Sequence, residues 1–190
     1  MKIILCCNSP RRKELLSGLG LDYGVRVVGD IDESYPHSMP AKNVAQYIAE
    51  KKADAYTAAE EEIILTADTV VIVDNEILGK PKDGADAARM LRLISGRTHQ
   101  VITGVCLKNR DKRISFSVST DVTFKLLSED EISYYIVHYR PFDKAGAYGI
   151  QEWIGFIGVT ELNGSYFNVM GLPVQRIYDA LVNQFGVSVE

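Results

Sequence analysis

Residues 2–17 read KIILCCNSPRRKELLS, and this stretch decides the fold because it joins a buried strand directly to a helix. Lys2–Cys7 is a short apolar run with β-branched residues, which is the pattern of a buried strand. Ser9 is a natural N-cap, and Pro10 fits the first position of a helix. The leucines that follow give this helix an apolar side. A strand that leads into a helix in this way is typical of an α/β protein.

The rest of the chain continues the alternation of strands and helices. Further strands are predicted at Tyr23–Val28, Ile63–Val73, Thr98–Leu107 and Ile114–Leu126, the last two forming a hairpin around a turn at 109–111. Further helices are predicted at Ala41–Glu62, at Gly84–Ile94, from the capping box at Ser128 to about His138, and from Pro173 to about Asn183. Phe142–Gly171 is Gly-rich, and we expect it to be irregular with short strands. This order of elements predicts an α/β protein with a mixed sheet and flanking helices.

Length, charge and cysteine content exclude several classes of protein. The chain has 190 residues, which is the size of one domain of roughly 100–200 residues, so residues 1–190 are expected to form a single domain. A formal net charge of -4 gives no electrostatic reason to expect nucleic-acid binding. No apolar run approaches the roughly 20 residues that span a bilayer, and the first residues do not form a signal peptide. Three cysteines without disulfide or zinc spacing indicate a reducing, cytoplasmic location.

The first candidate for chemistry is the start of the first helix. Free backbone N–H groups and the helix dipole favour an anion there, and Ser9, Arg11 and Arg12 add a hydroxyl and two guanidinium groups suited to phosphate oxygens. The alternative is a capped helix whose basic side chains are only solvated. Cations near a helix N-terminus oppose the dipole, which favours the reading that an anion binds there.

The second candidate is Asp68, which lies inside the most apolar strand, IILTADTVVIV at Ile63–Val73. A carboxylate surrounded by apolar residues must be paired or bound to a metal. Asp68 is therefore a candidate to bind Mg²⁺ or to activate a water molecule. The alternative is an aspartate that caps a turn at the end of the strand.

Two loops complete the set of candidates. Lys80 lies in the loop GKPK, and Gln151 ends the loop DKAGAYGIQ, whose glycines allow a backbone to approach a flat ligand. The carboxamide of Gln151 can both donate to and accept from the edge of a nucleobase. Alone, each loop is also consistent with a purely structural role. An acidic loop that contains Asp30, Asp32 and Glu33 is a weaker candidate.

Five motifs in order, ILCCNSPRRKELL, ADTVVIVDNEILGKP, SGRTHQVITGV, DKAGAYGIQ and NVMGLP, resemble the Maf family of nucleotide pyrophosphatases. The resemblance covers nearly the whole chain and implies a fold like that of the inosine triphosphate pyrophosphatases, with an elongated mixed sheet and two lobes around a central cleft. It implies a hydrolase, dependent on Mg²⁺ or Mn²⁺, that converts a nucleoside triphosphate to a monophosphate and pyrophosphate. The loop DKAGAYGIQ is similar to the branch that acts on dTTP and UTP.

The resemblance also assigns roles to particular residues. Asp68 matches the catalytic carboxylate, and Glu33 matches a polar position that lines the cleft. We expect Asp68, together with Glu33, to hold the metal. The substrate-binding positions are matched by Ser9, Arg11, Arg12, Lys52, Thr69, Lys80 and Gln151. A homodimer is expected from the family, with no nucleic-acid or membrane partner.

Two departures from the family pattern stand out. Cys6-Cys7 replace Ala-Ser at the end of the first strand, and both cysteines are better interpreted as core residues than as nucleophiles. Glu152 replaces the glycine that usually follows Gln151, which places a charge beside the proposed base-binding residue. Two other functions remain: a nucleotide-sensing regulator of cell division and septum formation that does not cut its ligand, and a pyrophosphatase acting on 7-methyl-GTP.

Overall fold

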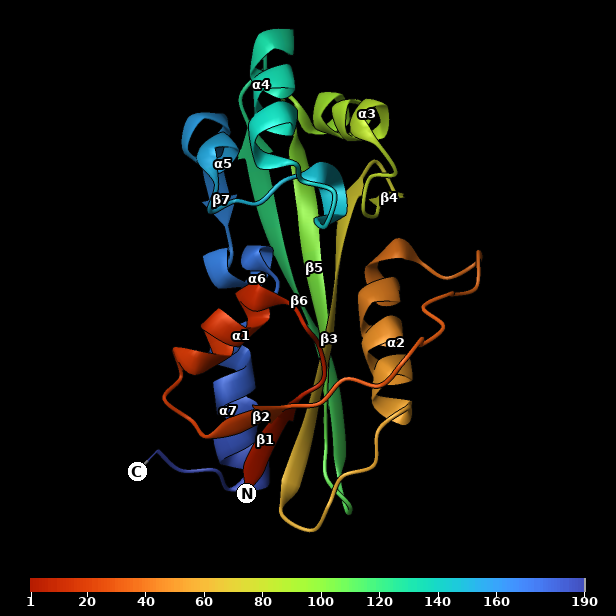
Figure 1. Cartoon of the computed structure of the whole chain (residues 1–190), viewed down its shortest axis with the longest axis vertical. Coiled ribbons are helices and arrows are strands. Elements are labelled where there is room, and N and C mark those ends of the chain that lie inside the picture. Colours follow the sequence, from red (N-terminus) through yellow and green to blue (C-terminus); the bar gives the residue numbers. More distant parts are fainter. Residues whose placement is uncertain (190) are drawn as a thin grey trace. The chain divides into compact units, whose positions relative to one another are not determined.

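Seven strands form one mixed sheet in the order β2-β1-β3-β5-β6-β7, with β4 paired to β3 (Figure 1). The computed structural model describes residues 1–189. The strands are β1 (Lys2–Leu5), β2 (Tyr23–Val25), β3 (Glu62–Val73), β4 (Glu76–Leu78), β5 (Thr98–Lys108), β6 (Arg113–Phe124) and β7 (Val159–Asn163). The helices are α1 (Pro10–Ser17), α2 (Ala41–Asp54), α3 (Gly84–Ile94), α4 (Glu129–Tyr139), the 3-10 helix η1 (Ala145–Ala147), α5 (Trp153–Gly158), α6 (Tyr166–Met170) and α7 (Val174–Phe185). The mixed α/β class with flanking helices is confirmed.

The described chain divides into two compact units. The first unit contains residues 1–68, 103–118 and 171–189, and the second contains residues 69–102 and 119–170. The strands β3, β5 and β6 contribute residues to both units. The elongated form, the central cleft and the single domain of the sequence analysis stay predictions.

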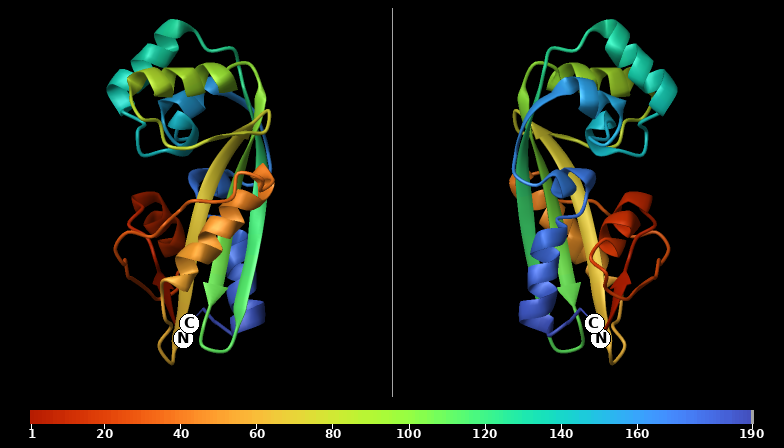
Figure 2. Two further views of the ribbon diagram at one scale, coloured as in Figure 1. Left: turned by 90° about the vertical axis from the view of Figure 1, so that its right-hand side faces the viewer. Right: turned by 90° about the vertical axis from the view of Figure 1, so that its left-hand side faces the viewer.

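In the first unit, β1 pairs in parallel with both β2 and β3. The helix α1 joins β1 to β2, and α2 joins β2 to β3. Figures 1 and 2 show α2 on one face of these strands and α1, together with α7, on the other. The chain therefore reverses its direction of winding between β1 and β3. In open parallel sheets, ligands bind beyond the carboxyl ends of the two strands at such a switch point.

The helix α2 packs on the sheet with its backbone against β5. A Cβ atom on Gly104 would lie 2.2 Å from the backbone nitrogen of Gln46, so only glycine fits beneath the helix there. Ala49 and Ala53 extend this contact to Cys106 in a small buried cluster. Small residues on both elements thus set the close approach of α2 to the sheet.

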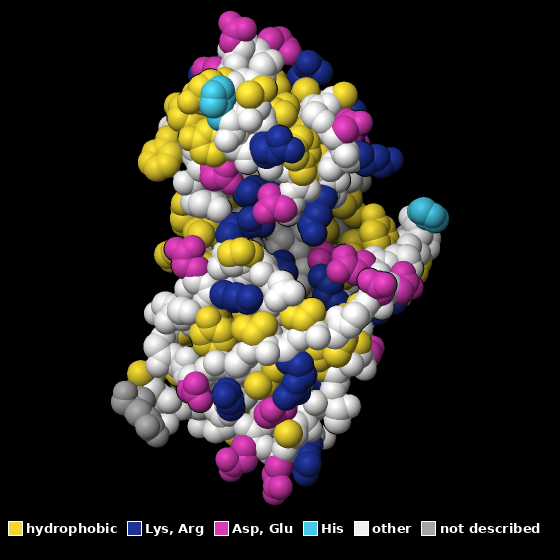
Figure 3. All heavy atoms as spheres, viewed as in Figure 1, with side chains coloured by type: hydrophobic (Ala, Val, Ile, Leu, Met, Phe, Trp, Pro, Cys, Tyr) yellow, Lys and Arg dark blue, Asp and Glu magenta, His cyan; other side chains and the backbone are white. Residues whose placement is uncertain are grey.

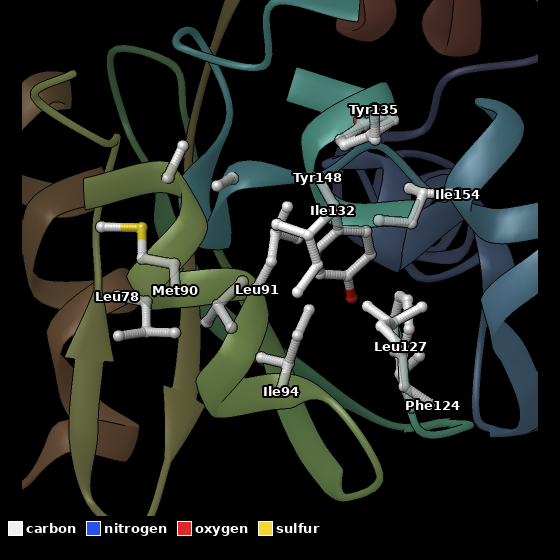
Figure 4. Close-up of a cluster of buried hydrophobic side chains, with 14 of the residues drawn as sticks. Leu78, Met90, Leu91, Ile94, Phe124, Leu127, Ile132, Tyr135, Tyr148 and Ile154 are labelled. Atoms are coloured by element: carbon white, nitrogen blue, oxygen red, sulfur yellow. The ribbon is translucent and has the colours of Figure 1, made fainter. Parts of the chain in front are cut away.

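The core of the second unit is a large cluster of buried apolar side chains between the sheet and α3, α4 and the 145–154 segment. Figure 4 shows the Tyr148 ring pointing into this cluster, near Leu127 and Phe124. The two rings meet edge to face with centroids 5.1 Å apart. Ala147, Tyr148 and Ile150 of the DKAGAYGIQ loop belong to this core, which holds the loop in place.

Two predicted boundaries are wrong by three residues or more, and the strands predicted to end at Cys7 and Leu126 each end two residues earlier. The predicted helix Ala41–Glu62 ends at Asp54 instead, because Tyr56 turns into a buried cluster with Ile4 and Ile64 and leads the chain back to the sheet. Its alanine-rich sequence favours a helix for longer, but burial of this tyrosine outweighs that preference. The predicted strand Tyr23–Val28 ends at Val25, although the backbone N–H of Arg26 still donates to Leu5.

The irregular segment Phe142–Gly171 contains more regular structure than its glycines indicate: η1, two short helices and the strand β7. The other predicted elements are found at their expected places. The capping box at Ser128 is present, with both hydrogen bonds to Glu131. Asp74 and Asn75 form the predicted turn after β3 with positive φ angles of 48° and 65°.

The surface carries charges of both signs. On the face shown in Figure 3, Lys and Arg side chains are interspersed with Asp and Glu side chains. Within residues 1–189, every helix is too short or too polar to cross a membrane.

Candidate active site

The first group of polar side chains in the first unit lies where β1 ends and α1 begins. The side-chain oxygen of Ser9 accepts from the backbone N–H of Arg12 at 3.4 Å, so the predicted N-cap is confirmed. The Arg12 guanidinium donates through Nε to the carbonyl of Gly171 at 2.8 Å and through a terminal nitrogen to that of Ala67 at 3.1 Å. These bonds orient Arg12 at the end of β1 and tie it to the neighbouring strand β3.

The second group lies where α2 faces β3. Thr66 and Asp68 are two residues apart on the strand and point to the same face. Thr66 donates to the carbonyl of Ala49, and one turn later Lys52 reaches Asp68, with 2.8 Å between Nζ and Oδ1. Lys52 also donates to the carbonyl of Ala67 at 3.4 Å. The side chains of Lys52 and Asp68 are 14% and 16% exposed, so solvent screens this ion pair only partly.

Glu33 joins the same cluster from the loop before α2. Its Oε1 lies 3.1 Å from Lys52 Nζ, and its side chain is 57% exposed. One ammonium group therefore bridges the carboxylates of Glu33 and Asp68. The two carboxylates supply oxygen atoms, which are the ligands that Mg²⁺ and Mn²⁺ prefer. These metals commonly bind through one or two carboxylates together with the phosphates of a substrate, and the pair fits that pattern.

No group of three or more His, Cys, Asp or Glu side chains is placed to hold a metal ion anywhere in residues 1–189. A metal bound by Asp68 and Glu33 would therefore depend on water molecules and substrate for its remaining ligands. This is the usual arrangement at sites that bind Mg²⁺ together with phosphates.

An adjacent ion pair has a different character. Lys51 lies 2.7 Å from Asp32, whose side chain is 70% exposed. The Lys51 ammonium, together with Ser34, holds the pKa of Asp32 well below its ordinary range. This pair fastens the acidic loop to α2 and thereby places Glu33 beside Lys52.

The candidate residues of the second unit lie around the DKAGAYGIQ loop. The backbone N–H of Gly146 donates to the carbonyl of Gly79 at 3.1 Å, which joins this loop to the one that carries Lys80. Gly146 has a φ of 72°, and a Cβ atom there would lie 2.9 Å from Val71. Lys80 itself is exposed, and the Gln151 side chain is half-buried. The Gln151 Oε1 atom is buried and has no hydrogen-bond partner within residues 1–189.

A largely buried ion pair lies within the same loop. Lys144 Nζ lies 2.9 Å from Glu152 Oε1 and 3.0 Å from Asp143 Oδ1. The side chains of Lys144 and Glu152 are only 11% and 17% exposed. The sequence analysis noted Glu152 as an added charge but missed its partner, because nothing in the spacing of the loop shows which lysine it contacts.

Buried polar groups support this loop from behind. The Tyr148 hydroxyl bonds to His99 Nε2, and the Tyr135 hydroxyl accepts from the backbone N–H of Gly149 at 3.0 Å. Burial lowers the pKa of His99 to about 4 and raises the pKa of both tyrosines well above their ordinary value. All three are therefore neutral near pH 7 and act as hydrogen-bonding supports.

The structure thus connects several of the predicted residues. Arg12, Glu33, Lys52 and Asp68 belong to two linked groups in the first unit, since both Arg12 and Lys52 donate to Ala67. Arg11 and Thr69 are half-buried, with Arg11 in the first unit and Thr69 in the second.

Cys6, the residue that follows β1, has no catalytic character. Cys6 is buried, and burial raises the pKa of its thiol to about 12, which removes the reactive thiolate at neutral pH.

Comparison with known proteins identifies the family of this chain. Residues 2–184 match the family model described as Maf-like protein. A protein of Phocaeicola vulgatus named dTTP/UTP pyrophosphatase is 58% identical over 182 residues, covering 95% of this chain and 94% of the relative. Proteins of the same name from Bacteroides fragilis and Porphyromonas gingivalis are 54% and 53% identical, covering 95% and 98% of this chain and 94% and 96% of their own.

Among solved structures, the Staphylococcus aureus Ham1 protein is similar to 65% of this chain over 72% of its own length, at 14% identity and a TM-score of 0.46. The family model covers nearly the whole chain, and the relatives share more than half of its residues. The chain therefore belongs to the Maf-like protein family.

Proposed function

We propose that this chain is a metal-dependent pyrophosphatase that hydrolyses dTTP and UTP to the nucleoside monophosphate and pyrophosphate. The observation that carries the proposal is the Glu33–Lys52–Asp68 cluster, in which one cation bridges two carboxylates beyond the switch point of the sheet. The relatives named dTTP/UTP pyrophosphatase support the choice of reaction and substrate.

The reaction breaks the bond between the α-phosphorus and the bridging oxygen of the β-phosphate. Water attacks the α-phosphorus, pyrophosphate leaves with the bridging oxygen, and the proton that the water loses is released to solvent. Asp68 holds the attacking water by accepting a hydrogen bond from it. Arg11, Arg12 and Lys52 provide positive charge for the phosphate oxygens, on which negative charge accumulates as the bond breaks.

Asp68 and Glu33 are the residues proposed to hold the divalent metal. When bound, Mg²⁺ or Mn²⁺ would supply positive charge to the phosphate oxygens of the substrate. Lys52 contacts both carboxylates, so its ammonium would share these oxygens with the metal that they would hold.

Gln151 is the residue proposed to recognise the nucleobase, and Lys80 and Thr69 are proposed to contact the substrate. The buried Oε1 atom of Gln151 lacks a donor, and the N3–H group of uracil or thymine is a donor of suitable chemistry. The amide nitrogen can donate to O4 of the same base. A rotated carboxamide would instead match cytosine, so the orientation of Gln151 decides between the two kinds of pyrimidine.

The test is pyrophosphate release from dTTP, UTP, CTP and 7-methyl-GTP, with Mg²⁺, with Mn²⁺ and with EDTA. Asp68→Asn is assayed beside Asp54→Asn, a matched control that breaks the exposed Arg113–Asp54 pair at the end of α2. Release from dTTP and UTP that EDTA abolishes is expected. We expect Asp68→Asn to lower kcat at least about 100-fold and Asp54→Asn to leave it within about twofold.

Other outcomes would contradict the proposal. Near-normal turnover by Asp68→Asn would remove Asp68 from the catalytic step. Preference for 7-methyl-GTP would identify the other branch of the family. Nucleotide binding without release of pyrophosphate from any substrate would support the nucleotide-sensing regulator instead.

We propose a cytoplasmic location, a homodimer and no nucleic-acid partner. The reducing character implied by the cysteines and the net charge of -4 support the first and third of these. Sedimentation of the purified protein measures the oligomeric state, and a salt-dependent gel shift tests nucleic-acid binding.

A further inference from the structure

The Lys144–Glu152 ion pair connects the two ends of the loop that carries Gln151. The two charged atoms are 2.9 Å apart, and both side chains are largely buried. Asp143 also contacts Lys144 at 3.0 Å, but its side chain is 62% exposed. Exposed ion pairs contribute little, whereas removing one partner of a buried pair leaves an uncompensated charge. The contact with Glu152 is therefore the one that constrains the loop.

The backbone between these two residues is shaped to allow the pair. A Cβ atom on Gly149 would lie 2.6 Å from Glu152 Oε1 and 2.9 Å from Lys144 Cε, so a larger residue there would displace the two side chains from their present contact. The backbone N–H of Glu152 donates to the carbonyl of Gly149 at 3.0 Å and closes the turn. Tyr135 holds the other side of the turn by accepting from Gly149. The turn 149–152 is thus fixed by its backbone and by the ion pair together.

Gln151 lies within this turn, immediately before Glu152. Its Oε1 atom is enclosed and lacks a donor within residues 1–189. Because no hydrogen bond to Oε1 holds the carboxamide, its position depends on the backbone of the turn that carries it. A carboxamide held in one orientation presents one order of donor and acceptor. A carboxamide free to rotate can present both orders, and it then discriminates poorly between uracil and cytosine.

We infer that Glu152 is a specificity-determining positioning residue: through its ion pair with Lys144 it fixes the orientation of the Gln151 carboxamide, and it thereby favours uracil and thymine nucleotides over cytosine nucleotides. This inference rests on the proposed function and extends it to a residue at which the chain departs from the family pattern. Glu152 acts through Gln151 and does not contact the reacting atoms.

The experiment compares Glu152→Gln, Lys144→Met and the double variant with the wild-type chain. For each, kcat and KM are measured with UTP and with CTP, and thermal unfolding is recorded. Glu129→Gln is the matched control, because it breaks the exposed Arg92–Glu129 pair of the same unit, which is 2.8 Å long. Glu152→Asp, which keeps the charge on a shorter side chain, tests for rescue.

We expect each single variant to raise KM for UTP and to lower the ratio of kcat/KM for UTP over CTP by about tenfold, with a smaller change in kcat. The double variant should lower this ratio by less than the product of the single effects, because its second substitution removes the charge that the first leaves unpaired. Glu152→Asp should fall between Glu152→Gln and the wild type. Glu129→Gln should behave as the wild type.

A ratio that stays at the wild-type value in both single variants would overturn the inference, even if their unfolding temperatures fall. The same holds if kcat falls equally for both nucleotides with no change in KM. The proposed function fails in a different way, when the wild-type chain releases pyrophosphate from none of the nucleotides. That result would overturn this inference as well. The two failures are distinguishable, because failure of the proposed function is seen in the wild-type chain without any variant.

Discussion

The contact of Gly104 with α2 links the stability of the first unit to the geometry of the proposed catalytic cluster. A Cβ atom at position 104 would lie 2.2 Å from the nitrogen of Gln46 and 2.3 Å from the carbonyl carbon of Ala45. Both atoms belong to the helix backbone, so no side-chain rotation can relieve the contact. Non-bonded carbon atoms pack at about 3.5–4.0 Å, and α2 must therefore withdraw by more than about 1 Å in Gly104→Ala.

This displacement has two measurable consequences. Overpacking of a core costs about 1–3 kcal/mol, and a contact with helix backbone places this variant near the upper value. In a chain of this length about 3 kcal/mol corresponds to a fall in Tm of about 6–12 °C. The same movement carries Lys52 away from Asp68, whose present contact is 2.8 Å, to beyond hydrogen-bonding distance.

The assay combines thermal unfolding with pyrophosphate release, and Gly29→Ala is the control. Gly29 has open space around its Cβ position, so its substitution should leave Tm and activity nearly unchanged. For Gly104→Ala we expect the fall in Tm together with a loss of kcat/KM of at least about tenfold, because misplacement by about 1 Å can cost about 100-fold. A Tm within about 1 °C of the wild type would refute the reasoning about this contact.

Two further predictions concern titration and metal binding. Burial lowers the pKa of His99 to about 4, whereas the pKa of histidine in the unfolded chain is about 6.5. As the pH falls from 7 to 5, His99 therefore becomes protonated in the unfolded chain but not in the folded one. This difference should lower the free energy of unfolding by about 2 kcal/mol. Denaturant unfolding at both pH values checks this, and His99→Gln should lack that part of the loss; an unchanged pH dependence in the variant would contradict it. Lys52→Met leaves the carboxylates of Glu33 and Asp68 without their shared cation and should lower Tm in EDTA by about 4–8 °C, with Mg²⁺ restoring part of the loss. The control Lys51→Met removes an exposed pair and should lower the free energy of unfolding by less than about 1 kcal/mol. A Tm of Lys52→Met that does not change with Mg²⁺ would contradict the proposed metal site.

Local chemistry made most of the elements predictable. Strands and helices with apolar periodicity and caps, such as the helix α3 after Asp83 and the capping box at Ser128, appear where the sequence places them. The failures occur where a tertiary contact outweighs local preference. The helix α2 ends early because Tyr56 is buried. The segment Phe142–Gly171 forms short helices despite its glycines.

The sequence by itself determined the mixed α/β class, the capped start of α1 and the anomaly of a carboxylate in the most apolar strand. These follow from residue type and spacing along the chain. Only the tertiary structure decided the partners. Lys52 contacts both Glu33 and Asp68, and Glu152 contacts Lys144, because the packing of α2 on β3 and the turn at Gly149 bring these residues together. Ion pairs depend on distance in space, which spacing in sequence does not specify beyond a single helix or strand.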